Sequence, residues 1–314
     1  MTWLVTGGAG YIGSHVVNSF VQAEIPVAVL DDFSSGLESR CPGGIKIFDS
    51  DICDPREVQL IFDSIELSGV IHCAAKKSVE ESFSIPEVYE KVNVSGTANL
   101  LETSKKSGIK NFVYSSSAAV YGNQEQKIVS EEVVCKPVSP YGQTKLAAEN
   151  LVTKAGQQGL NVCSLRYFNV AGAANKSLSD TSIDNLFPIV LHQLLEGKQP
   201  HIFGSDYDTP DGTCIRDYVH IDDLAKIHKE IALQLANRKV PSVINVGTGR
   251  GISVKEVIEA ITKALNSKIV PILDERRPGD IGQLVADVHL LERTLGHVPT
   301  KGLHEIVSSL VDII

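Results

Sequence analysis

Short apolar runs alternate with amphipathic segments along the first half of the chain. The runs predict strands at residues 2–6, 27–30, 45–48, 69–72 and 111–115, and the stretches at 55–64 and 85–107 have the pattern of helices. Strands that alternate with helices in this way form a parallel sheet covered on both faces. The pattern therefore predicts an α/β fold with a doubly wound parallel sheet, whose ligands bind at the C-terminal ends of the strands.

The first strand passes directly into a glycine-rich turn, Gly7-Gly8-Ala9-Gly10-Tyr11-Ile12-Gly13, and then into a helix. Gly7 can take the positive φ of a tight turn, Gly10 lets the backbone approach a pyrophosphate, and Gly13 lets the helix pack against the strand. The phosphates are expected at the helix N-terminus, where unpaired N–H groups and the helix dipole favour anions. This order of elements predicts a Rossmann-like dinucleotide site.

The second strand ends in two carboxylates, Asp31 and Asp32. They follow the glycines by about twenty residues, the spacing at which an acidic residue accepts hydrogen bonds from the adenosine ribose. A carboxylate there also repels a ribose phosphate, so the pair favours NAD over NADP as the cofactor. The alternative is that Asp31 and Asp32 only open a loop.

Two later segments carry candidate catalytic side chains. Tyr141 and Lys145 are four residues apart in a helix that begins near Pro140, so they share one helix face. Ser117 follows the strand at 111–115. A tyrosine with a pKa of about 10 is a poor base at neutral pH, but a neighbouring ammonium favours its phenolate. We predict hydride-transfer chemistry in which Tyr141 moves the proton, Ser117 orients the substrate and Lys145 lowers the tyrosine pKa, although each residue alone could be an ordinary loop or surface residue.

Composition narrows the possible partners and location. The 314 residues carry a net charge of −9 and no Lys/Arg-rich run, which argues against a nucleic-acid-binding surface. No apolar run has the length of a membrane span, and no leader precedes the first strand, so we expect a cytoplasmic protein that does not contact membranes. The six cysteines are scattered without metal-ligand spacing, so neither a metal site nor a disulfide framework is expected.

Several ordered stretches resemble the extended short-chain dehydrogenase/reductase family over nearly the whole chain. They are residues 5–15, 111–122, 139–142, 165–169, the run from Asp211 to Tyr218, and residues 276–280. Within that family the sequence is most similar to the 4-epimerases of UDP-sugars. The resemblance implies a Rossmann-like doubly wound sheet with a smaller C-terminal substrate-binding domain.

The resemblance also implies two sets of binding residues. The cofactor set is Gly7, Gly10, Tyr11, Ile12, Gly13, Asp31, Asp32, Asp51, Ile52, Lys77, Asn93, Tyr141, Lys145, Tyr167 and Phe168. The substrate set is Ser117, Tyr141, Asn169, Asn185, Leu186, Phe203, Arg216, Arg277, Asp280 and Leu284. Arg216 and Arg277 could clamp a diphosphate and Phe203 could offer uracil an apolar face, although each arginine alone could also form a surface ion pair.

The activity implied by the resemblance is an NAD-dependent interconversion of UDP-glucose and UDP-galactose through a 4-keto sugar. Tyr141 would take the proton from O4 while C4 gives its hydride to NAD. A second enzyme class is a nucleotide-sugar 4,6-dehydratase, which needs an Asp-Glu pair where this chain has Ala118 and Ala119. Another nucleotide-sugar epimerase is a further alternative, and a non-catalytic NAD-sensing protein is disfavoured by the presence of Ser117, Tyr141 and Lys145 together.

Leu284 bears on substrate breadth. It falls where the epimerases that the chain resembles differ in the size of a residue near the sugar 2-substituent, and a bulky tyrosine there is associated with rejection of N-acetyl groups. Since leucine is smaller, we hypothesise that N-acetylated UDP-sugars such as UDP-GlcNAc and UDP-GalNAc are also accepted. The alternative is that Leu284 is ordinary core packing.

The chain is expected to form two domains and to assemble with a second copy. We assign residues 1–168 to the NAD-binding domain, to which 218–247 would return as a strand, a helix and a strand, and residues 169–217 and 248–314 to the substrate domain. The family resemblance suggests a homodimer formed through the helices that contain Asn93 and Tyr141.

Overall fold

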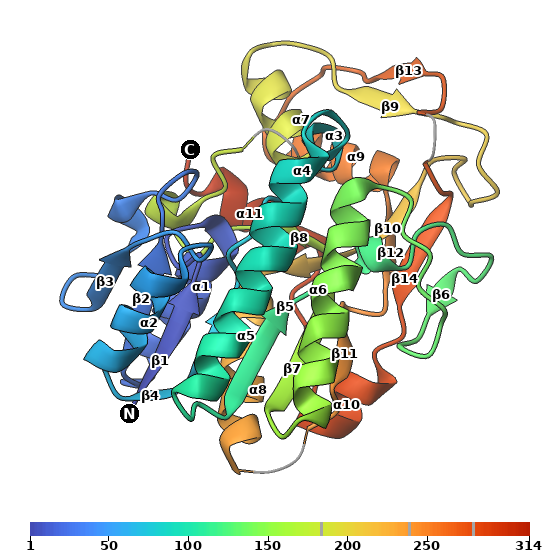
Figure 1. Ribbon diagram of the computed structural model, residues 1–314. Coiled ribbons are helices and arrows are strands. Elements are labelled where there is room, and N and C mark those ends of the chain that lie inside the picture. Colours follow the sequence, from blue (N-terminus) through green and yellow to red (C-terminus); the bar gives the residue numbers. More distant parts are fainter. Residues whose placement is uncertain (183–184, 238–239, 278–279) are drawn as a thin grey trace.

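The apolar runs of the first half become strands of one parallel sheet (Figure 1). Within residues 1–182, 185–237, 240–277 and 280–314, which the computed structural model describes, this sheet has seven strands in the order β11-β7-β5-β4-β1-β2-β3. Their bounds are β1 Thr2–Thr6, β2 Val27–Asp31, β3 Lys46–Asp49, β4 Leu67–His72, β5 Asn111–Ser115, β7 Asn161–Tyr167 and β11 Val243–Val246. The predicted doubly wound α/β fold is confirmed.

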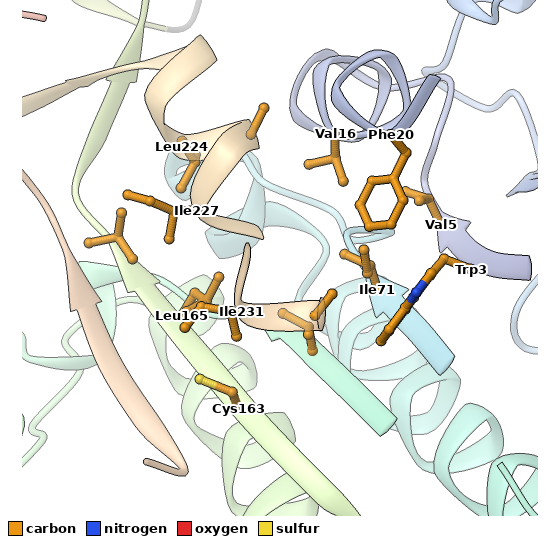
Figure 2. Close-up of a cluster of buried hydrophobic side chains, with 14 of the residues drawn as sticks. Trp3, Val5, Val16, Phe20, Ile71, Cys163, Leu165, Leu224, Ile227 and Ile231 are labelled. Atoms are coloured by element: carbon orange, nitrogen blue, oxygen red, sulfur yellow. The ribbon is translucent and has the colours of Figure 1, made fainter. Parts of the chain in front are cut away.

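Helices cover both faces of this sheet. On one face lie α1 (Tyr11–Val21) and α8 (Ile221–Asn237), and on the other lie α2 (Pro55–Ser64), α5 (Gly96–Lys106) and α6 (Pro140–Gln157). Figure 2 shows the first of these interfaces, where Val16 and Phe20 of α1 pack over Trp3, Val5 and Ile71, and Leu224, Ile227 and Ile231 of α8 pack near Cys163 and Leu165. Apolar burial on both faces makes the sheet a rigid support for side chains at its C-terminal edge.

The helix predicted at 85–107 is continuous but not regular. It consists of α4 (Pro86–Tyr89), a π-helical stretch at Glu90–Ser95, and α5. The wider turn of a π-helix inserts an extra residue and is frequent at functional sites. Asn93 lies in this stretch and its side chain is buried, so the irregular turn places a polar group inside the fold.

Smaller sheets and helices, most of them from the second half of the chain, lie at the top and right of the view in Figure 1. One sheet contains β12 (Gly251–Ser253), β10 (Ile215–His220), β14 (Gln283–Ala286) and β6 (Ile128–Val129), with β8 (Asn169–Ala171) also paired to β10, and the other pairs β13 (Ile272–Asp274) with β9 (His201–Phe203). The helices α7 (Leu186–Leu195), α9 (Val254–Ala264) and α11 (Leu303–Val311) share one apolar core. Two further helices lie outside that core, α3 (Val79–Ser84) against α6 and α10 (His289–Leu295) against β11.

One strand lies in a different sheet from the one expected. The strand predicted at 218–221 is β10, which begins at Ile215 and pairs with β8, β12 and β14, so its expected return to the large sheet is wrong. The edge beside β7 is occupied instead by β11, and α8 packs on that face. We propose the two domains assigned in the sequence analysis, except that β10 belongs to the substrate domain and not to the NAD-binding domain.

The buried face of α8 yields a test of the packing. Leu224 is fully buried on α8, whereas Leu60, on α2, is 62% exposed. Leu224→Ala should lower the free energy of unfolding by about 2–5 kcal/mol, because it removes buried methyl groups and leaves a cavity. The matched control Leu60→Ala should change it by less than about 0.5 kcal/mol. Urea denaturation measures both, and equal losses would contradict this packing.

Candidate active site

The glycine turn after β1 leaves no room for side chains. Gly7 has a φ of +68°, and a Cβ there would lie 2.6 Å from the backbone nitrogen of Ala74. A Cβ on Gly13 would lie 2.0 Å from the carbonyl oxygen of Gly7. Gly10 is the N-cap of α1, and no side chain of the described residues caps this N-terminus. The turn therefore presents backbone N–H groups of Tyr11, Ile12 and their neighbours to an anion such as a pyrophosphate.

Asp31 is fixed beside this turn. Its Oδ2 accepts a hydrogen bond from the Ala9 amide at 2.9 Å, and its Oδ1 accepts one from the Phe33 amide at 2.9 Å. Burial raises the pKa of Asp31, and the two amides act against that shift. Each carboxylate oxygen keeps a second lone pair that a ribose hydroxyl could use. Asp32 is exposed and accepts a hydrogen bond from the Ser34 amide.

The other predicted adenosine residues lie in the loop after β3. Asp51 is exposed and accepts a hydrogen bond from the Cys53 amide at 2.8 Å. Ile52 is buried, and its carbonyl accepts a hydrogen bond from Asn99 Nδ2 at 2.7 Å. Together with Asp31 they line the C-terminal ends of β2 and β3, where an adenosine is expected in this fold.

The structure brings Ser117 and Tyr141 together. Ser139 caps α6 through its Oγ, which accepts a hydrogen bond from the Gly142 amide at 3.1 Å, and Pro140 occupies the first helical position. This start places Tyr141 in the first turn of α6, close to the turn that follows β5, because a Cβ on Gly142 would lie 2.7 Å from the carbonyl oxygen of Ala119. There the Ser117 hydroxyl acts on the Tyr141 phenol. Because Ser117 directly follows β5, the pair lies at the C-terminal edge of the large sheet.

Burial dominates the electrostatics of this pair. It raises the pKa of Tyr141, and the hydrogen bond from Ser117 lowers it. Burial also lowers the pKa of Lys145 to about 8. The Lys145 Nζ donates a hydrogen bond to the carbonyl of Ser115 at 2.9 Å. Ser117 is thus the group that opposes the effect of burial on the phenol, and the role predicted for Lys145 stays a prediction.

Asn93 and Lys77 are occupied by protein partners. Asn93 Oδ1 accepts a hydrogen bond from the Lys76 amide at 2.8 Å, and its Nδ2 donates to the Lys76 carbonyl at 3.1 Å and to Thr144 Oγ1 at 3.0 Å. Asn93 therefore ties the loop after β4 to α6. The Lys77 Nζ donates to Ser182 Oγ at 2.9 Å. Both cofactor roles stay predictions.

Tyr167 and Phe168 lie where β7 ends. Burial raises the pKa of Tyr167, and Ser115 acts against that shift. Phe168 is buried, with its ring centroid 6.4 Å from that of Tyr121. Tyr167 thus lies beside the end of β5 and Phe168 beside the turn after Ser117, on the side where the nicotinamide is expected.

The predicted substrate residues are spread over the smaller sheets and helices. Asn169 lies in β8, Asn185 at the N-cap of α7, Leu186 in α7, Phe203 in β9, Arg216 in β10 and Leu284 in β14, with Arg277 and Asp280 between β13 and β14. Pro278 and Gly279, from the last of the stretches that carry the family resemblance, lie outside the described residues.

Contacts join some of these residues in pairs. The Arg277 guanidinium lies 3.7 Å from the ring centroid of Phe203. Arg216 Nη1 donates a hydrogen bond to the Ile281 carbonyl at 2.8 Å, and its Nη2 lies 3.9 Å from Asp280 Oδ1. Two cations and an aromatic face are the groups that a uridine diphosphate requires. These contacts support the predicted substrate set without testing it.

Asn185 and Leu284 have different surroundings. Asn185 Nδ2 donates a hydrogen bond to Asp180 Oδ2 at 3.2 Å. Leu284 is 9% exposed, is paired with Arg216 between β14 and β10, and packs in one apolar cluster with Ala118 and Phe168. Leu284 therefore contributes to a core that borders Ser117.

Segment 172–182 was not predicted to reach the nucleotide-binding elements, yet it contacts them. The Tyr11 hydroxyl donates to the Gly172 carbonyl at 2.6 Å. Arg40, which is buried, donates through Nη2 to the Ser179 carbonyl at 2.6 Å. With the Lys77 contact to Ser182, these bonds fasten the segment to α1, to the loop after β2 and to the loop after β4. A lone arginine in a loop gave no sequence signal for this role.

The described parts of the chain show neither a metal cluster nor a membrane-spanning helix. They contain no cluster of three or more His, Cys, Asp or Glu side chains placed to hold a metal ion. In the same residues no helix is long and apolar enough to cross a membrane.

Comparison with known proteins agrees with this geometry. The sequence model of the NAD dependent epimerase/dehydratase family matches residues 3–247. UDP-glucose 4-epimerase of Azospirillum brasilense is 39% identical over 301 residues, which cover 94% of this chain and 86% of that protein. The crystal structure of UDP-glucose-4-epimerase from Stenotrophomonas maltophila, with bound NAD and formylated UDP-arabinopyranose, has a TM-score of 0.93 and 34% identity, covering 99% of this chain and 97% of that one. The UDP-Glc/GlcNAc 4-epimerase of Campylobacter jejuni has a TM-score of 0.88 and 35% identity, covering 99% and 98%.

The bond between Ser117 and Tyr141 predicts a shift in titration. Ser117→Ala should raise the pKa of Tyr141, because it removes the hydrogen bond that lowers this pKa and leaves burial unopposed. The tyrosinate absorbance of Tyr141 in the variant is the difference between Ser117→Ala and a Ser117→Ala/Tyr141→Phe double variant. It should therefore appear at higher pH than the difference between the parent protein and Tyr141→Phe. An unchanged midpoint would mean that the two hydroxyls do not interact in solution.

Proposed function

This chain belongs to the NAD dependent epimerase/dehydratase family, and from that premise we propose that it is an isomerase, an NAD-dependent UDP-glucose 4-epimerase. It would interconvert UDP-glucose and UDP-galactose through a 4-keto sugar. The observation that carries this proposal is the placement of Ser117, directly after β5, and Tyr141, in the first turn of α6, at the C-terminal edge of the sheet that also presents the glycine turn. A proton-transfer group and a dinucleotide site at one edge are what reversible oxidation of a sugar carbon requires.

The nucleotide-binding elements fit NAD. Gly7 and Gly13 keep the turn bare, and Asp31 offers carboxylate oxygens beside it. When bound there, NAD supplies the acceptor for the hydride of C4 and gives the same hydride back. We propose that the cofactor set named in the sequence analysis holds NAD. Asn93 contributes to it by fixing the loop at Lys76.

Tyr141 performs the proton transfer. As a phenolate its Oη takes the proton of the sugar O4, and as a phenol it returns that proton to O4 of the inverted sugar. Ser117, which acts on the Tyr141 phenol, can share its hydroxyl with O4 and so hold that oxygen near the phenol. Lys145 lies one turn further along α6, and its buried amino group has a pKa near neutrality, about 8. We propose that Lys145 favours the phenolate when protonated.

Inversion at C4 requires that the hexose turn over while UDP stays fixed. The Arg277 guanidinium over Phe203, and Arg216 beside Asp280, offer a firm hold on the uridine diphosphate. Ala118 and Ala119, the two residues that follow Ser117, have small side chains. Binding energy from the remote nucleotide can then orient the sugar without clamping it. The same two alanines disfavour a 4,6-dehydratase, since they provide no acid or base for the elimination of water.

We also propose a cytoplasmic homodimer. The interface would involve the helices that contain Asn93 and Tyr141. Val79 and Phe83 on the neighbouring α3, which packs against α6, support this assignment because they are apolar and exposed. Their burial by a second copy would remove apolar surface from water.

Turnover of UDP-galactose tests the proposed activity. The purified protein should form UDP-glucose from UDP-galactose without added NAD, followed by NMR. Tyr141→Phe should lower kcat by about 100- to 10,000-fold because it removes the proton-transfer group. Tyr114→Phe is the matched control, since its buried hydroxyl has no hydrogen-bond partner among the described residues and its loss should leave kcat unchanged. Full activity of Tyr141→Phe would overturn the catalytic assignment.

Leu284 gives a test of substrate breadth. We propose that UDP-N-acetylgalactosamine is also turned over, because Leu284 is smaller than tyrosine and belongs to the apolar cluster that contains Ala118, the residue after Ser117. Leu284→Tyr should lower kcat/KM for this sugar by about tenfold or more while sparing UDP-galactose. The ratio of the two kcat/KM values is the measurement. Equal losses for both sugars would show that Leu284 only packs the core.

A further inference from the structure

One face of α6 carries three polar residues at intervals of four, Tyr141, Lys145 and Glu149, and all three are buried. Residues at this spacing lie above one another along a helix. The Lys145 Nζ donates to the carbonyl of Ser115 at 2.9 Å, and Ser116 Oγ donates to Glu149 Oε2 at 2.6 Å. The helix that carries Tyr141 is therefore bonded to the two residues that immediately precede Ser117.

The Glu149 carboxylate is itself fixed from the opposite side. Arg166 of β7 donates from Nε to both carboxylate oxygens, at 3.2 and 3.1 Å, and from Nη2 to Oε1 at 2.5 Å. Arg166 Nη1 also donates to the Tyr121 hydroxyl at 3.1 Å, and that hydroxyl donates to Asn245 Oδ1 of β11 at 2.6 Å. This network joins β5, α6, β7 and β11 in the protein interior. Buried and mutually satisfied groups of this kind hold one arrangement rigidly.

We propose that Ser116 and Glu149 are positioning residues for the reaction. They set the distance between Ser117 and Tyr141 by holding the end of β5 against α6. The inference rests on the proposed function, but neither residue was assigned to it. Their effect comes through Ser117, because Ser116 is its chain neighbour and Glu149 accepts the hydrogen bond of the Ser116 hydroxyl. A displacement of about 1 Å in a catalytic group can cost about 100-fold in rate, so a small shift of Ser117 is measurable.

The test uses Ser116→Ala, because Glu149→Ala would leave the Arg166 guanidinium buried without its partner and endanger folding. Ser164 supplies the matched control. Both serines are fully buried, Ser164 in β7 and Ser116 directly after the adjacent strand β5, but the Ser164 hydroxyl has no hydrogen-bond partner within the described residues. Ser116→Ala should lower kcat for UDP-galactose about 5- to 10-fold with KM and bound NAD unchanged. Ser164→Ala should leave kcat unchanged.

A double-variant cycle separates positioning from general loosening of the fold. If Ser116 acts through Ser117, adding Ser116→Ala to Ser117→Ala should cost no further activity. Losses that multiply in the double variant, or an unchanged kcat for Ser116→Ala alone, would overturn the proposal.

The titration of Tyr141 gives a readout that does not depend on turnover. Ser116→Ala should raise the pKa of Tyr141 in the same direction as Ser117→Ala, because it weakens the bond between Ser117 and the phenol. A parent protein without epimerase activity would overturn the proposed function, and this titration would still decide the positioning role. An unshifted Tyr141 midpoint in Ser116→Ala, with Ser117→Ala shifted, would contradict it.

Discussion

Ser117 and Tyr141 act on each other although they come from different elements, the turn after β5 and the first turn of α6. Burial makes ionisation of the phenol costly, and the interaction with Ser117 works in the opposite direction. The pair can act only if the two elements keep a fixed separation. The parallel sheet and its apolar faces hold the two elements in place, and so do the hydrogen bonds that join α6 to Ser115 and Ser116.

The nucleotide-binding half and the second half of the chain are connected around this pair. β7 ends at Tyr167 and passes at once into β8, which pairs with β10 of the smaller sheet. Segment 172–182 then contacts Tyr11 and Arg40 beside the glycine turn. A dinucleotide on one side and a UDP-sugar on the other can therefore meet at Tyr141.

Local patterns predicted the large sheet well, because period and turn chemistry are properties of short segments. Asp54 caps α2 before Pro55, and the predicted bounds at 55–64 are those observed. The sheet to which β10 belongs could not be read from an apolar run, since such a run does not specify its partners. The pairing of Glu149 with Arg166 was also missed, because it joins residues on different elements and follows no motif. The roles of Asn93 and Lys77 came from family resemblance alone, and the structure adds protein partners that no local pattern indicates.

The central claim, that C4 is oxidised and then reduced at the same carbon, is tested most directly with UDP-galactose carrying deuterium at C4. We predict that the UDP-glucose formed carries the deuterium at C4, with none lost to water, as NMR of the product can determine. Deuterium found at C6 of a 4-keto-6-deoxy sugar would indicate a dehydratase instead. Loss of the label to solvent would contradict hydride transfer at this site.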